Sequence, residues 1–203
     1  IDYNQIDAWI VCTPWDVNSK ILLKLLPLRK PILIEKPIII NNKDLKKLYL
    51  EYGNKIFSKC HIAYNRNFYE YLPKIINILK RKSEFVIQAN LSDQYTSLIK
   101  KKGAKLKPYL VEYMTSHWLA FLYVISRNMK LNMNICADKN HGKNFKTLKY
   151  SLDKNQKKLI LINYIPNVPK NLNIDFFMKN SYINISPLES AKIIKKIEMQ
   201  TKN

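Results

Sequence analysis

Two side chains in this sequence are suited to acid–base chemistry. Lys36 stands in Glu35-Lys36-Pro37, directly after the apolar run 31–34, and His117 stands in a long apolar segment. Partial burial at the end of a strand lowers the pKa of a lysine, so Lys36 could polarise or hydrogen-bond a reacting oxygen. An imidazole with an ordinary pKa of about 6.5 can accept a proton at neutral pH. The pair would supply the cation and the base that proton removal from a hydroxyl group needs.

Each residue also has a purely structural interpretation. A Glu-Lys-Pro tripeptide after an apolar strand is often only the exit of that strand. His117 is flanked by Trp118 and Leu119, and a histidine on an apolar helix is more often a hydrogen-bonded core residue than a proton carrier. The chemical interpretation therefore depends on elements that bring Lys36 and His117 together.

The first 65 residues predict a β-α-β-α-β unit. The apolar run 6–14 is typical of a parallel strand buried on both faces, the run 31–34 predicts a second buried strand, and the run 56–63 predicts a third strand. The first helix is expected to begin at Asp16 and to end at Pro27, and the second to begin at Asn41 or Asn42 and to end near Gly53. Short connections between strands and helices indicate a parallel sheet with right-handed crossovers.

The rest of the chain predicts an α+β domain with a mainly antiparallel open sheet. Helices are expected over 68–82 and 109–125, and strands over 85–91, 131–137, 159–164, 174–178 and 182–185. Ser186, Pro187 and Glu189 form a helix-start pattern, which predicts a last helix to about Met199. We place the domain boundary near Asn65, giving domains over 1–65 and 66–203.

Several motifs together resemble one family of oxidoreductases. Glu35-Lys36-Pro37 resembles the Glu-Lys-Pro signature of the glucose-fructose oxidoreductase and inositol dehydrogenase family. The run 6–14, ending in Thr13-Pro14, looks like the family's fourth Rossmann strand, and 64–68 looks like its crossover motif. Thr115-Ser116-His117 looks like the Gly-Ser-His on the long helix of its substrate domain. The resemblance is good over 6–80, thinner around His117 and architectural beyond it.

This resemblance implies a hydride transfer between NAD or NADP and a hydroxyl or carbonyl of a sugar, nucleotide sugar or cyclitol. Lys36 and His117 would be the catalytic pair. Thr13, Pro14, Glu35 and Lys36 would line the nicotinamide and its ribose, with Arg66 near the same pocket. The resemblance also implies a homo-oligomer, formed through an exposed face of the second sheet that carries Ile160, Ile162 and Phe176.

The sequence also departs from the family pattern. Tyr113 stands one helical turn before His117, where the family's dehydrogenases usually carry Asp; Tyr113 could still donate a hydrogen bond there. The only glycines are Gly53, Gly103 and Gly142, so no glycine-rich phosphate-binding turn is present and NAD cannot be distinguished from NADP. We expect the first part of the dinucleotide-binding domain to lie before Ile1.

Composition limits the other classes of function. The net charge of +20 could indicate a nucleic-acid-binding domain, but only four of the 35 basic residues are Arg and the lysines are spread along the chain. No apolar run reaches the roughly 18 residues of a membrane span. The three cysteines form no CxxC pair, which predicts no disulfide framework and no metal site, but buried thiols in a reducing cytoplasm.

Three functional hypotheses remain open. The first is a cytoplasmic NAD(P)-dependent oxidoreductase of sugar metabolism that binds neither nucleic acid nor membrane. The second is a catalytically idle relative that binds a ligand or partner through the same cleft, which Tyr113 and the absent glycine turn favour. The third is a basic nucleic-acid-binding domain.

Overall fold

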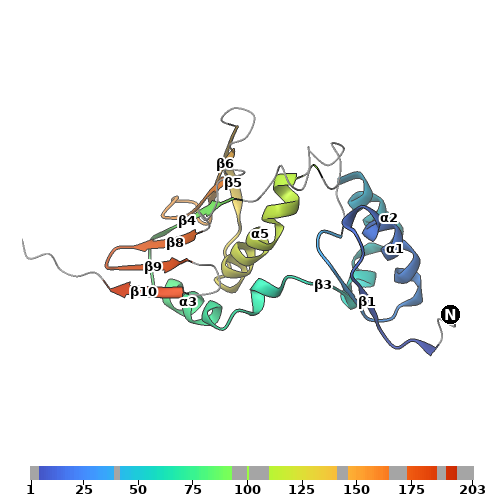
Figure 1. Cartoon of the computed structure of the whole chain (residues 1–203). Coiled ribbons are helices and arrows are strands. Elements are labelled where there is room, and N and C mark those ends of the chain that lie inside the picture. The colour runs from blue at the N-terminus through green and yellow to red at the C-terminus, as the bar shows by residue number, and fades with distance from the viewer. Residues whose placement is uncertain are drawn as a thin grey trace, which may run out of the picture. The chain divides into compact units, whose positions relative to one another are not determined.

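The computed structural model describes residues 5–38, 42–92, 100, 110–140, 146–164, 173–186 and 191–195. These residues form two compact units (Figure 1). The first comprises the chain up to Arg66 together with the α5 residues up to Trp118, and the second comprises the remainder. The functional division into a dinucleotide-binding domain over 1–65 and a second domain over 66–203 stays a prediction.

The first unit is built on a parallel three-stranded sheet in the order β1-β2-β3. Its strands are β1 (Trp9–Val11), β2 (Ile32–Ile34) and β3 (Cys60–Ile62), and its connecting helices are α1 (Trp15–Leu25) and α2 (Asn42–Ile56). Short 3₁₀ turns, η2 (Leu26–Leu28), η3 (Phe57–Lys59) and η4 (Asn65–Phe68), lie between these elements. The predicted β-α-β-α-β order and parallel pairing are therefore confirmed.

The core of the first unit lies between this sheet and its helices. Apolar side chains from β1, α1, η2, β2 and α2 form one buried cluster: Val11, Leu22, Leu25, Leu26, Ile32, Ile34 and Leu48. Alternate strand residues point to the opposite face, where Ile10 is 74% exposed and Leu33 is 43% exposed. The prediction that the strand in 6–14 is buried on both faces is wrong for the described residues, because the helices cover one face of β1 and Ile10 is exposed on the other.

The second unit contains a seven-stranded sheet in the order β10-β9-β8-β4-β7-β6-β5. All neighbouring strands are antiparallel except β4 and β7. The elements are α3 (Tyr71–Lys80), β4 (Phe85–Leu91), α5 (Leu110–Asn128), β5 (Asn134–Asn140), β6 (Lys146–Ser151), β7 (Lys158–Tyr164), β8 (Asn173–Met178), β9 (Ser181–Ile185) and β10 (Ala191–Lys195). This mixed, mainly antiparallel sheet confirms the predicted fold class.

Residue alternation gives this sheet a buried face and a polar face. β4 alternates without interruption, with Phe85, Ile87, Ala89 and Leu91 buried and the residues between them half-buried. Figure 1 shows α3 and α5 on one side of the sheet, and the helices contribute buried side chains such as Ile75 and Phe121 to the core. An apolar core thus lies on one side of the sheet. The other side carries polar side chains that hydrogen-bond to one another.

Three details of the sequence interpretation are wrong. Residues 191–195 form β10 rather than part of a last helix, because pairing with β9 along its whole length outweighs the local helix-start pattern at Ser186. Ile160, Ile162 and Phe176 are buried, so they do not lie on an exposed sheet face. Cys12 and Cys136 are exposed thiols rather than buried ones.

Among the residues that the structure describes, no helix is both long enough and apolar enough to cross a bilayer.

Candidate active site

Asn18 connects the ends of β1 and β2 and so defines the frame of the candidate site. Its side chain is completely buried. Its Oδ1 accepts a hydrogen bond of 2.6 Å from Thr13 Oγ1, and its Nδ2 donates to the backbone oxygens of Glu35, at 3.0 Å, and Pro37, at 3.2 Å. One side chain therefore holds the segment after β1 against the segment after β2.

Lys36 lies in the segment after β2, between the two backbone oxygens that Asn18 binds. Its side chain is half-buried, while the preceding Glu35 is exposed. The Lys36 backbone N–H donates to Glu35 Oε2 at 3.2 Å, and the Glu35 backbone N–H donates to the backbone oxygen of Val11 at 2.9 Å. The sheet's hydrogen bonding thus continues one residue past β2 and places Lys36 at the carboxyl end of the sheet, where open α/β sheets bind ligands.

His117 lies on α5 and belongs to the same compact unit as Lys36. Burial, and to a smaller extent the nearby positive charges of Lys36 and Arg66, together lower the pKa of His117 from 6.5 to about 4. Its Nδ1 is buried and has no hydrogen-bond partner among the residues that the structure describes. The imidazole is therefore neutral at pH 7 and able to accept a proton.

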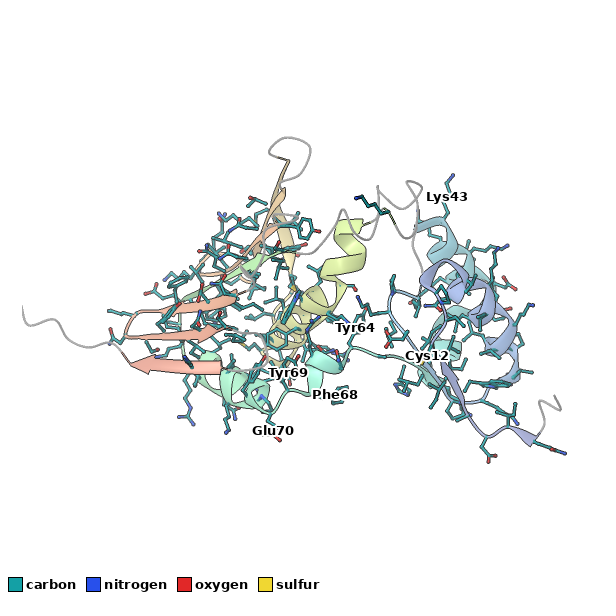
Figure 2. The ribbon with its side chains drawn as sticks, viewed as in Figure 1. Cys12, Lys43, Tyr64, Phe68, Tyr69 and Glu70 are labelled. Carbon is teal, nitrogen blue, oxygen red and sulfur yellow. The ribbon has the colours of Figure 1, made fainter. Side chains whose placement is uncertain are left out.

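Two aromatic residues contact the side chains of this site: Tyr64 contacts His117, and Trp118 contacts Arg66. Tyr64, which follows β3 (Figure 2), meets the His117 ring edge-on with centroids 5.9 Å apart, and burial raises the pKa of its hydroxyl group. The Arg66 guanidinium lies 4.2 Å from the ring centroid of Trp118, which is 3% exposed. A cation–π contact at this distance fixes Arg66 on the helix residue next to His117.

The structure brings together residues that lie far apart in the sequence. Lys36 and Arg66 each interact electrostatically with His117, although 81 positions separate Lys36 from His117 in the sequence (117 − 36). Thr13 is half-buried beneath Asn18, and Pro14 precedes the first residue of α1. Tyr113 lies on α5, but its side chain is outside the described residues. The roles assigned to these residues stay predictions.

Sequence reasoning did not assign a role to Asn18, Tyr64 or Trp118. Asn18 carried a recognisable signal, because it lies four residues before Leu22 on the buried stripe of α1, where an isolated polar side chain needs partners. Within the described part of the chain, no group of three histidine, cysteine or carboxylate side chains could hold a metal ion.

Comparison by sequence found no protein-family model and no curated protein that matches the chain. Comparison by structure found several dehydrogenases. One from Chromobacterium violaceum is 10% identical with a TM-score of 0.72, and the match covers 95% of this chain and 57% of that one. A UDP-N-acetylglucosamine 3-dehydrogenase from Acidithiobacillus ferrooxidans is 12% identical with a TM-score of 0.67, and the match covers 95% and 62%.

A third match is an inositol dehydrogenase homologue from Azotobacter vinelandii, solved in complex with NAD+. It is 12% identical with a TM-score of 0.66, and the match covers 95% of this chain and 58% of that one. The chain thus spans roughly three fifths of the length of these proteins. It has the α/β fold of NAD-dependent dehydrogenases over the part that it spans.

Proposed function

We propose that the chain is part of an NAD(P)-dependent oxidoreductase of the glucose-fructose oxidoreductase and inositol dehydrogenase family. The reaction would move a hydride between a nicotinamide cofactor and a hydroxyl or carbonyl group of a sugar, nucleotide sugar or cyclitol. The observation that carries the proposal is that Lys36 and Arg66 both interact electrostatically with a neutral His117, at the carboxyl end of a dehydrogenase-type sheet.

His117 and Lys36 would share the proton chemistry. Oxidation of an alcohol requires its hydroxyl group to lose a proton while the hydride leaves its carbon. His117 Nδ1 is buried and unpartnered within the described residues, so a substrate hydroxyl can donate to it. The Lys36 ammonium would stabilise the negative charge that develops on the same oxygen. Tyr113, one turn before His117, would orient the substrate through a hydrogen bond.

The nicotinamide cofactor, NAD or NADP, would supply the hydride acceptor. Thr13, Pro14, Glu35, Lys36 and Arg66 would hold its nicotinamide end. Glu35 is exposed beyond β2, and Thr13 is held in place by Asn18, so both lie where a ligand of an open α/β sheet is expected. The NAD+ complex of the Azotobacter vinelandii homologue supports the class of cofactor.

The proposal is tested with Lys36→Met in the protein expressed from its natural gene. Turnover of NAD+ or NADP+ with a panel of sugars, nucleotide sugars and cyclitols is expected to fall by about 10²–10⁴-fold, far more than the affinity for the cofactor. Lys20→Met is the matched control, because Lys20 is an exposed lysine on α1 and its removal alters the charge equally. Equal activity of the two variants would remove Lys36 from the mechanism.

A catalytically idle binding protein is the second candidate, and the low pKa of His117 favours it. A base with a pKa of about 4 is present in the correct form at pH 7 but accepts a proton weakly. Calorimetry distinguishes the two candidates: the idle protein would bind dinucleotide or sugar without turning over any member of the panel.

We also propose that residues 66–203 bind the substrate and form a cytoplasmic homo-oligomer through the polar side of the seven-stranded sheet. Phe177 on that side is 44% exposed and contacts Tyr182, with ring centroids 5.3 Å apart. An exposed Phe177 packed on the half-buried Tyr182 fits the self-complementary contact of two identical subunits. Light scattering should show an oligomer that Phe177→Asp dissociates, and a monomer at high concentration would refute this proposal.

A further inference from the structure

Asn18 is the one side-chain amide that is completely buried among the described residues of the first unit. Its neighbours on the buried face of α1 are Leu22 and Leu25, both part of the apolar core. Burying an amide among apolar side chains costs free energy unless each of its groups is hydrogen-bonded. The hydrogen-bond partners of the Asn18 amide should therefore explain why a polar side chain occupies this buried position.

Those partners are all at the candidate active site. The two N–H groups of Asn18 donate to the backbone oxygens of Glu35 and Pro37, at 3.0 and 3.2 Å, which flank Lys36 on either side. The hydroxyl group of Thr13 donates to Oδ1 at 2.6 Å and so fixes which end of the amide faces Lys36. These three partner groups lie in the segments that follow β1 and β2, and all three are bound by one side chain of α1.

We propose that Asn18 is a positioning residue for Lys36: it holds the backbone on both sides of Lys36 so that the ammonium group stays beside His117. The catalytic meaning of this role rests on the function proposed above. The positioning itself does not, because it concerns only the distance between two side chains of this chain.

The alternative is that Asn18 merely completes the core packing of α1. The two interpretations differ in what happens to His117. The Lys36 charge lowers the pKa of His117, so a Lys36 that moves away would let this pKa rise towards its ordinary value, whereas loss of packing alone would leave it unchanged. The imidazole thus reports the position of Lys36 without any substrate.

The test is an NMR titration of the protein expressed from its natural gene. Asn18→Leu keeps a similar side-chain volume and removes all three hydrogen bonds. The signal of His117 is assigned with His117→Gln, because the chain also contains His61 and His141. Lys36→Met gives the rise in the His117 pKa when the charge is absent, and Asn18→Leu is expected to reproduce at least about half of that rise.

Leu22→Val is the matched control, because it removes volume from the same buried face of α1 and touches none of these hydrogen bonds; it should leave the His117 pKa unchanged. If Asn18→Leu does not fold, Asn18→Gln, which retains the amide but displaces it, should raise the pKa by a smaller amount. An unchanged His117 pKa in a folded Asn18 variant, together with a rise in Lys36→Met, would overturn the proposal. That outcome is independent of turnover, so it leaves the oxidoreductase proposal standing.

Discussion

The neutral His117 makes the folded chain sensitive to acid at one identifiable residue. Its folded pKa of about 4 lies below the ordinary value of 6.5, so between these two pH values the unfolded chain binds more protons than the folded chain. The contribution of His117 to the free energy of unfolding is thus fully present above pH 6.5 and is lost as pH falls through about 4.

We therefore predict that His117→Gln reduces the loss of stability on acidification. The urea midpoint of the wild-type chain should fall more between pH 7 and pH 4.5 than that of the variant, because glutamine does not titrate. The carboxylates and the other histidines are the same in both proteins, so their contributions cancel in the comparison. Parallel pH profiles for the two proteins would contradict this prediction.

At the same scale, the sequence predicted which residue types would do chemistry but not how they are held. Glu35-Lys36-Pro37 and His117 could be recognised because each lies in a local pattern, a strand exit and an apolar helix. The bonds of Asn18 connect positions 17 and 19 residues away, and the stacking of Arg66 on Trp118 spans 52 positions (118 − 66). Such contacts depend on tertiary packing, which no local pattern reports.

The elements of the second unit carry a continuous row of hydrogen-bonded side chains across the polar side of the sheet. Thr147 on β6 donates to Asn163 on β7, Asn163 to Asn90 on β4, and Asn90 to Asn173 on β8, over 3.2, 2.9 and 3.1 Å. The row ends at Asp175, which is 6% exposed. Its carboxylate accepts hydrogen bonds from Asn173, Tyr182 and Asn184.

Asp175→Ala is predicted to lower the free energy of unfolding by about 3 kcal/mol, because three half-buried donors on β8 and β9 lose their shared acceptor. Urea denaturation of the variant measures this. Asp153→Ala is the control, since Asp153 accepts one backbone N–H, from Lys158 at 3.3 Å, and should cost less than about 1 kcal/mol. Equal losses for the two variants would show that the row contributes little.

This row also shows why the orientation of the second sheet could not be predicted. The alternation of β7 and β8 was visible in the sequence, but Ile160 and Phe176 were assigned to the exposed face, and only their register with β4 shows that they lie on the buried one. A strand interrupted by polar residues can bury either face, and a shift of one residue exchanges them. The error at β10 has a similar origin, because its partner β9 decides its conformation.

At the scale of the whole molecule, the parallel sheet of the first unit has an accessible edge strand. β1 is the outer strand of the described sheet, and a groove of about 510 Å³ runs along it, lined mainly by apolar residues of β1, α1 and η2. Ile10 beside this groove is 74% exposed. A strand that has one unpaired edge and exposed apolar side chains can pair with strands of other chains.

The isolated 203-residue chain is therefore predicted to aggregate despite its net charge of +20, and to bind NAD and NADP negligibly. Dinucleotides are held chiefly by their pyrophosphate at a helix N-terminus behind a glycine-rich turn, and Gly53, Gly103 and Gly142 form no such turn. The groups proposed to hold the nicotinamide, Thr13 and Glu35, would contribute too little alone. A longer protein in which a glycine-rich strand–turn–helix unit precedes this chain should instead bind the cofactor in the micromolar-to-millimolar range that is usual for enzymes.

Calorimetric titration of both proteins with NAD and NADP measures the difference. Tight binding by the 203-residue chain would show that the cofactor site is misplaced, because the described residues would then hold the pyrophosphate without a glycine turn. Failure of both proteins to bind would favour the idle binding protein over the oxidoreductase. Cofactor binding by the longer protein that Lys36→Met lowers far less than turnover is the result expected if Lys36 acts mainly on the substrate oxygen.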